Sequence, residues 1–274
     1  MDIFPMTAQS RSHSHIQSHI LITGASSGIG AALALNYARS GTHLILWGRN
    51  QERLEQIAKK AQQHGASTET HVIDLNNTNH ALECLQHIDS DHPIDICIFA
   101  AGISDIRPET ELTELPHIVQ NIACVNFSTP ITLATEMAKR MAIRKSGNIA
   151  LIGSVAAFHD LPMASAYSGS KAGLARFSTA LHAAMKPHNV FVTLISPGYV
   201  DTPMSQRLVG ARPFLVSPQK AARLISKAIG QGRAHLLFPR IFFITKVLEY
   251  LMPRSITHRL LRIANVKQNP STLK

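Results

Sequence analysis

Short apolar runs alternate with longer segments of helical periodicity along most of this chain, and this alternation restricts its fold more than any other feature. The runs lie near 19–23, 42–47, 69–73, 94–100, 147–153, 190–195 and 234–238, and the helical segments include 28–40, 51–64 and 164–186. Strands that alternate with helices build βαβ units, whose right-handed crossovers give a parallel sheet covered on both faces. The sequence therefore predicts an α/β fold with a doubly wound parallel sheet, arranged as a three-layer sandwich.

Length and composition are those of one folded domain between two tails. The chain has 274 residues, of which 45% are hydrophobic and 16% charged, a balance typical of a globular protein. Residues 1–18 predict a flexible N-terminal tail, 19–239 carry the alternating pattern, and 240–274 predict a helical, basic and apolar extension. His13 and His15 are a weak metal motif that a solvated tail explains as well, so we expect no metal site.

Cysteine usage and the lack of a secretory signal predict a cytoplasmic protein. Cys84, Cys97 and Cys124 have no paired spacing, and residues 1–19 lack the apolar segment of a secretory signal. No apolar stretch reaches the roughly 18 residues that a spanning helix needs.

The formal net charge is +10, and residues 234–274 hold seven of the 27 Lys and Arg but only one of the 17 acids. Without the motif of a nucleic-acid-binding module, this basic tail gives no reason to expect a nucleic-acid partner.

A glycine-rich turn, TGASSGIG at 23–30, follows the first apolar run directly. Its glycines, Gly24, Gly28 and Gly30, lie where a strand turns into a helix. A missing Cβ allows positive φ and lets a bulky group approach the backbone. Free N–H groups at a helix start favour an anion such as pyrophosphate. The turn therefore predicts a dinucleotide site.

This turn resembles the T-G-x-x-x-G-x-G cofactor turn of the short-chain dehydrogenase/reductase family. Further motifs follow in the family's order: Asp74 in HVIDL, Asn126 in CVNFSTP, Ser154 in IALIGSVAA, YSGSK at 167–171 and SPGYVDT at 196–202. The resemblance covers about residues 19–240. It implies a Rossmann-type fold and a nicotinamide-dependent oxidoreductase that acts on carbonyl or alcohol groups.

One motif departs from the family pattern. Members usually carry N-N-A-G after the fourth strand, whereas this chain has Phe99, Ala100, Ala101 and Gly102. The small residues expected beside the cofactor are kept and both asparagines are lost. The departure puts in doubt the hydrogen bonds that those asparagines make to the sheet, but not the chemistry.

Tyr167 and Lys171 are four residues apart, so a helix places the ammonium and the phenol on one face. A phenol has a reference pKa of about 10, and we expect the neighbouring cation to lower it. The resemblance implies that Tyr167 exchanges the proton with the substrate oxygen and that Ser154 hydrogen-bonds this oxygen. It also implies that Lys171 holds the nicotinamide ribose and that Asn126 positions a water.

The end of the second strand bears on the choice of cofactor. A site for NAD needs a carboxylate there for the ribose 2′-hydroxyl, but Trp47 is followed by Gly48, Arg49 and Asn50. A guanidinium can bind a 2′-phosphate, so Arg49 predicts NADP(H); the alternative is a solvated arginine at a helix start. The expected cofactor contacts are Gly24, Ser26, Ser27, Gly28, Ile29, Gly30, Arg49, Asp74, Leu75, Ala101, Gly102, Tyr167, Lys171, Pro197, Gly198, Val200 and Thr202.

The substrate pocket should lie beyond Ser154, under segment 199–216. The side chains expected to line it are Ser154, His159, Met163, Tyr199, Met204 and Phe214. Their mainly apolar character predicts an apolar ketone or aldehyde, a lipid- or steroid-like molecule, or an acyl thioester. The alternative is that these loop residues pack on one another.

The extension supports two interpretations. Segment 240–264 has an apolar face with a basic flank, which suits either a membrane surface or a second subunit, and we expect a homodimer or homotetramer. Two rival functions follow: a sensor or scaffold that binds NADP on the same fold, or a docking protein dominated by its tail.

Overall fold

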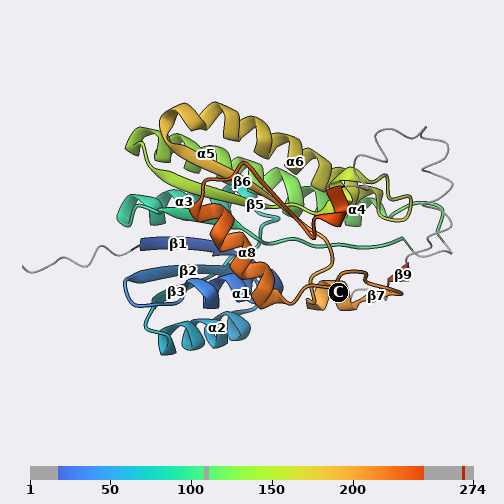
Figure 1. The fold of residues 1–274 in the computed structure, drawn as a ribbon, viewed down its shortest axis with the longest axis horizontal. Helices are drawn as coiled ribbons and strands as arrows, with labels where there is room; N and C mark the ends of the chain where they lie inside the picture. Colours follow the sequence, from blue (N-terminus) through green and yellow to red (C-terminus); the bar gives the residue numbers. More distant parts are fainter. Residues whose placement is uncertain (1–17, 108–110, 244–266, 269–274) are drawn as a thin grey trace, which may run out of the picture.

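A seven-stranded parallel sheet forms the centre of the computed structural model, which describes residues 18–107, 111–243 and 267–268 (Figure 1). Its strand order is β3-β2-β1-β4-β5-β6-β8, and each predicted apolar run supplies one strand. The strands are β1 (Ser18–Thr23), β2 (Thr42–Gly48), β3 (Ser67–Val72), β4 (Ile96–Phe99), β5 (Gly147–Ile152), β6 (Val190–Pro197) and β8 (His235–Phe238). The predicted doubly wound fold is confirmed.

Helices cover both faces of this sheet. Figure 1 shows α5 and α6 on one side and α1 and α2 on the other. Alternate strand residues point to opposite faces, so Ile22 joins the core under α1, α2 and α8, whereas Leu21 joins the core under α3, α5 and α6. The helices are α1 (Gly28–Tyr37), α2 (Gln51–Gln63), α3 (Thr78–Asp91), α4 (Pro116–Ala123), α5 (Thr129–Arg144), α6 (Ser165–Met185), α7 (Pro203–Gln206) and α8 (Pro218–Gly230).

The strand order reverses between β1 and β4. The chain after β1 enters α1 on one face, whereas the chain after β4 runs toward helices of the other face. Such a switch point opens a crevice at the carboxyl ends of the strands, where ligands bind in open α/β sheets. The glycine-rich turn and residues 100–107 form its two sides.

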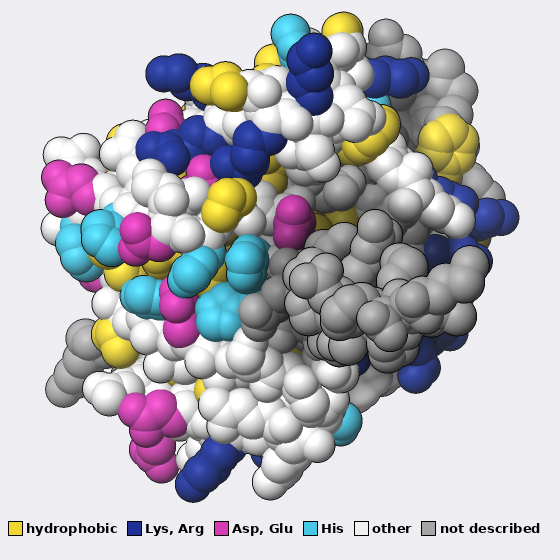
Figure 2. Space-filling model, turned by 90° about the vertical axis from the view of Figure 1, so that its left-hand side faces the viewer, with side chains coloured by type: hydrophobic (Ala, Val, Ile, Leu, Met, Phe, Trp, Pro, Cys, Tyr) yellow, Lys and Arg dark blue, Asp and Glu magenta, His cyan; other side chains and the backbone are white. Residues whose placement is uncertain are grey.

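Histidines gather at the opposite end of the sheet, where the strands begin (Figure 2). The rings of His19, His43 and His92 have centroids 5.4 to 6.2 Å apart, and His43 Nε2 lies 3.5 Å from Glu69. Burial lowers the pKa of His43, although Glu69 opposes this shift. No group of three or more His, Cys, Asp or Glu within the described ranges could hold a metal ion.

The chain leaves β8 at the carboxyl edge of the sheet, where the crevice lies. Residues 241–243 form a short helical turn, and β9 (Lys267–Gln268) pairs antiparallel with β7 (Leu208–Val209). No helix in the described part of the chain is long and apolar enough to cross a membrane. Most of segment 240–264 lies outside the described residues, so membrane or subunit docking through it stays a prediction.

Candidate active site

A single large pocket occupies the crevice at the carboxyl ends of the strands. Its volume of about 1390 Å³ exceeds the roughly 300–1,000 Å³ of ordinary ligand pockets, so it has room for a dinucleotide and a substrate together. Every residue expected to contact the cofactor lines it. Of the residues expected to contact substrate, Ser154, His159, Met163, Tyr199 and Met204 line it and Phe214 does not.

The glycine turn forms a cradle for an anion. Gly24 has φ +68°, and a Cβ there would come within 2.7 Å of the Ala101 backbone, so a larger side chain would block the turn. The first turn of α1 contains no acid, and the Ser27 side chain caps none of its N–H groups. These groups remain available for phosphate oxygens, so the turn fits a dinucleotide.

The segment after β4 is stabilised without the family's asparagines. Phe99 is buried against the α5 side of the sheet, and the Ala101 N–H donates to Thr23 Oγ1 at 3.1 Å. Apolar burial and this one side-chain hydrogen bond therefore hold the strand end beside the glycine turn. Ala100 and Ala101 leave space along the pocket wall.

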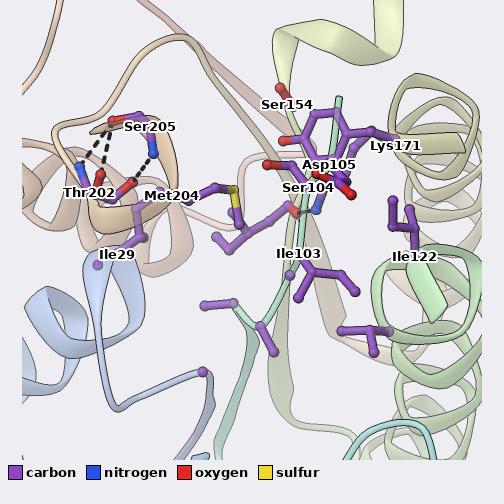
Figure 3. Close-up of a pocket in the computed structure, with 18 of the residues that line it drawn as sticks. Ile29, Ile103, Ser104, Asp105, Ile122, Ser154, Lys171, Thr202, Met204 and Ser205 are labelled. Atoms are coloured by element: carbon purple, nitrogen blue, oxygen red, sulfur yellow. Dashed lines mark hydrogen bonds between the residues drawn. The ribbon is translucent and has the colours of Figure 1, made fainter. Parts of the chain in front are cut away.

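Ser154, Tyr167 and Lys171 come together at one end of the pocket. Ser154 follows β5 and begins the 3-10 helix η2 (Val155–Phe158), where its Oγ accepts from the Ala156 N–H at 3.1 Å. Its hydroxyl is also hydrogen-bonded to the Tyr167 side chain. Figure 3 shows Ser154 and Lys171 on the same side of the cavity, the former after β5 and the latter on α6.

The electrostatics of this group differ from the expectation. We expected Lys171 to lower the pKa of Tyr167, but burial raises it, and the hydrogen bond from Ser154 opposes that rise only in part. Lys171 is itself 4% exposed, and burial lowers its pKa to about 8. Its Nζ donates to the Ile152 carbonyl at 2.8 Å and lies 5.9 Å from the Tyr167 ring centroid. Loss of solvent is the main cause of both shifts, because both groups are enclosed.

Asn126 is buried behind the pocket wall and does not line the pocket. It lies in a π-helical turn, η1 (Cys124–Ser128), between α4 and α5. Its amide accepts from the Ile103 N–H and donates to the Ile103 carbonyl, both at 2.8 Å, and it donates to Ser170 Oγ at 3.4 Å. The structure thus shows Asn126 connecting the backbone after β4 to α6, the helix that carries Tyr167 and Lys171. Its predicted contact with water stays a prediction.

Glu114 is a functional candidate that the sequence did not reveal. Its Oε2 accepts from the Ser165 hydroxyl and from the Ala166 N–H at 3.0 Å, although Ala164, the residue that precedes α6, provides no side-chain cap. A carboxylate at a helix start satisfies free N–H groups and is favoured by the helix dipole. Glu114 therefore anchors the helix that carries Tyr167 and Lys171.

The loop from 199 to 216 closes on itself beside the pocket. Asp201 N–H donates to the Val216 carbonyl, and Val216 N–H donates to the Tyr199 carbonyl, both at 2.9 Å. Thr202 and Ser205 cap each other around α7, and Met204 extends from this turn into the cavity (Figure 3).

The placement of Phe214 in the pocket was wrong. Phe214 has φ +57°, is 59% exposed and lies outside the pocket lining. Phe242 lines the pocket instead, and its ring lies 6.4 Å from that of Phe214. A Cβ on Gly198 would collide with the Phe242 ring, so the chain after β8 packs on the turn that follows β6.

Comparison with known proteins identifies the family. The family model of short chain dehydrogenases matches residues 18–212. The chain belongs to the short-chain dehydrogenase family. A fatty acyl-CoA reductase of Acinetobacter baylyi is 35% identical over 76% of this chain and 72% of its own length. An 11-beta-hydroxysteroid dehydrogenase-like protein of Arabidopsis thaliana is 31% identical over 85% and 80%.

Structural similarity extends over almost the whole short-chain dehydrogenase. A short-chain dehydrogenase from Sphingobium yanoikuyae, solved in complex with NADPH, matches with a TM-score of 0.75 and 22% identity, covering 93% of this chain and 99% of its own. At this identity the likeness establishes the fold. The chain is therefore an oxidoreductase of this family, with a nucleotide-binding Rossmann-type fold.

Sequence reasoning also missed residues at both ends of the pocket. Arg53, in the first turn of α2, lines it together with Arg49. The available signal was a second arginine shortly after the end of the same predicted strand. Arg107 and Asn121 line the pocket as well, and no motif marks either of them.

Proposed function

We propose that this short-chain dehydrogenase is an NADP(H)-dependent oxidoreductase that interconverts a carbonyl group and an alcohol on an apolar substrate. The observation that carries the cofactor choice is the pair Arg49 and Arg53. Both are exposed side chains on the pocket rim, directly after β2, where no carboxylate lines the pocket. Two guanidinium groups favour a 2′-phosphate through charge-assisted hydrogen bonds.

The proton chemistry belongs to Tyr167 and Ser154. Bound NADPH would supply the hydride. The Tyr167 phenol, whose pKa lies above its ordinary value of about 10, is protonated at neutral pH and is therefore in the form that can donate to a carbonyl oxygen during reduction. Ser154, already hydrogen-bonded to Tyr167, would stabilise the charge that develops on the same oxygen. Lys171 would hold the nicotinamide ribose from its buried position beneath the phenol.

The lining of the substrate end supports an apolar substrate. Ile103, Ile122 and Met204 face this part of the cavity in Figure 3, and Phe242 lines it from the chain after β8. An apolar ketone, an aldehyde, a lipid- or steroid-like molecule and an acyl thioester all fit such walls. The names of the acyl-CoA reductase and hydroxysteroid dehydrogenase-like relatives are consistent with this range.

Cofactor titration tests the proposal. Solved relatives at 25% identity include one complexed with NADP and one with NADH, so the choice depends on this chain's own residues. We expect NADPH to bind more tightly than NADH, and Arg49→Ala to weaken NADPH by about 1.5–3 kcal/mol with little effect on NADH. Arg53→Ala should act in the same direction. Equal affinities of the parent protein for the two cofactors would reject NADP specificity.

A further inference from the structure

Arg107 is a pocket residue whose charge the catalytic mechanism does not use. It is half-buried, and its N–H donates to the Met163 carbonyl at 2.8 Å, which holds it beside the loop that follows η2. Its Nη2 donates to Met163 Sδ at 3.1 Å. A thioether is a weak acceptor, so this contact satisfies little of the guanidinium's capacity for hydrogen bonds.

Two other arginines of the described residues are paired with carboxylates. Arg207 lies 3.4 Å from Asp105, and Arg212 lies 3.2 Å from Asp201. Among the described residues, no carboxylate forms an ion pair with Arg107. Arginine keeps its charge throughout the physiological pH range, and a partly buried charge without a counter-ion costs free energy. Within the described ranges, Arg107 is therefore a pocket cation without an ion-paired carboxylate.

Asn121 provides a second, independent observation. It lies on α4, lines the same pocket, and its Oδ1 is buried without a hydrogen-bond partner in the described part of the chain. Buried amides are normally hydrogen-bonded, and a flip that exchanges the oxygen and nitrogen of this one makes the unpaired atom an N–H donor, which suits an anion. Ile118 and Ile122 of the same helix also line the pocket, so Arg107 and Asn121 add one charged and one neutral polar group to a lining that is apolar along α4.

We propose that Arg107, assisted by Asn121, binds an anionic group of the substrate, so that the substrate is an apolar carbonyl compound carrying a carboxylate or a phosphate. The planar guanidinium can donate two parallel hydrogen bonds to either group. This inference rests on the proposed function, because it deepens the substrate specificity of the same pocket. Arg107 is a specificity-determining residue and takes no part in proton transfer.

The test uses three medium-chain methyl ketones that differ only at the far end: a carboxylate, a phosphate monoester or a neutral methyl ester. Each is assayed with NADPH against the parent protein, Arg107→Met, Arg107→Lys and the control Arg233→Met. Arg233 is an exposed arginine outside the pocket lining. Methionine keeps a long apolar side chain and removes the charge. Circular dichroism verifies that each variant is folded.

We expect Arg107→Met to lower kcat/KM for the better anionic ketone by about ten- to a hundredfold, as for the loss of a charged hydrogen bond. Turnover of the neutral ester should stay within about twofold, Arg107→Lys should recover part of the loss, and Arg233→Met should match the parent. The preferred anionic ketone identifies the group as carboxylate or phosphate. Equal use of charged and neutral ketones by the parent, or an equal loss for all three in Arg107→Met, would overturn the inference.

A binding measurement separates this inference from the proposed function. Calorimetric titration of the NADPH-saturated protein with a medium-chain carboxylate, an alkyl phosphate and an alkanol needs no turnover. If an anionic amphiphile binds to the parent protein and not to Arg107→Met, the inference is supported, whether or not any ketone is reduced. Failure to reduce any of the ketones would reject the proposed reaction and leave the anion site standing. Indifference to all three amphiphiles, in a protein that reduces the neutral ketone, would reject the anion site alone.

Discussion

Replacing Lys171 by methionine should stabilise the cofactor-free protein while abolishing its turnover. Burial moves the pKa of Lys171 from 10.5 to about 8, and the side chain is 4% exposed. At about 1.4 kcal/mol for each pH unit, keeping this ammonium charged costs the folded state about 3 kcal/mol. Losing its hydrogen bond to the Ile152 carbonyl costs about 1 kcal/mol. Lys171→Met should therefore gain about 2 kcal/mol near pH 7.

The pH dependence identifies the cause. The folded protein releases the Lys171 proton near pH 8, whereas the unfolded chain keeps it until its ordinary pKa near 10.5. Between these values the unfolded state binds more protons, so the stability of the parent protein rises with pH and the advantage of the variant shrinks. Above about pH 10.5 the charge penalty is absent from the parent as well.

Urea unfolding of both proteins, without cofactor, at a series of pH values from 7 to about 10 measures this difference directly. Lys171→Arg serves as the control, because it keeps the charge and should bring no stabilisation. A methionine variant less stable than the parent at pH 7 would refute the reasoning. A gain that does not change with pH would mean that packing, and not removal of a charge, causes it.

Two further predictions concern α6, the helix that carries Tyr167 and Lys171. Tyr167→Phe should keep the parent's NADPH affinity and lose nearly all turnover, because it removes the transferable proton; substantial activity on a confirmed substrate would contradict the assigned role. Glu114→Ala should lower the stability by about 1 kcal/mol through loss of the α6 cap and should reduce kcat more than it weakens NADPH. Glu114→Gln keeps an acceptor, so it should recover most of the stability in thermal melts and most of kcat in steady-state assays. A Gln variant as impaired as the Ala variant would exclude capping as the reason.

Periodicity made the sheet predictable. Parallel strands are buried on both faces, so runs such as 190–195 are almost continuously apolar. The glycine spacing is typical of few structures other than a strand-to-helix turn at a nucleotide site. The residues lining the cofactor end could be located because they follow directly from strand ends. The seven predicted strands are therefore found in the structure, with boundaries shifted by one or two residues in most cases.

Contacts between distant segments could not be predicted in the same way. Glu114 caps a helix that begins about fifty residues later, and its own neighbourhood carries no motif. The apolar character of Phe214 also led to a wrong placement in the pocket lining. An apolar side chain in a loop can face either way, and this one is exposed on a left-handed backbone. The Tyr167 pKa was misjudged because charge spacing is visible in a sequence but enclosure is not.

The packing of Phe242 against Gly198 has a consequence for how this enzyme is compared with others. The family model ends at residue 212, whereas the pocket draws one of its walls from thirty residues further along. A minimal enzyme trimmed after β8 would keep every family motif and lose this aromatic wall. Related enzymes can therefore differ in substrate specificity through changes beyond the last strand of the sheet, in a region outside the residues that the family model matches.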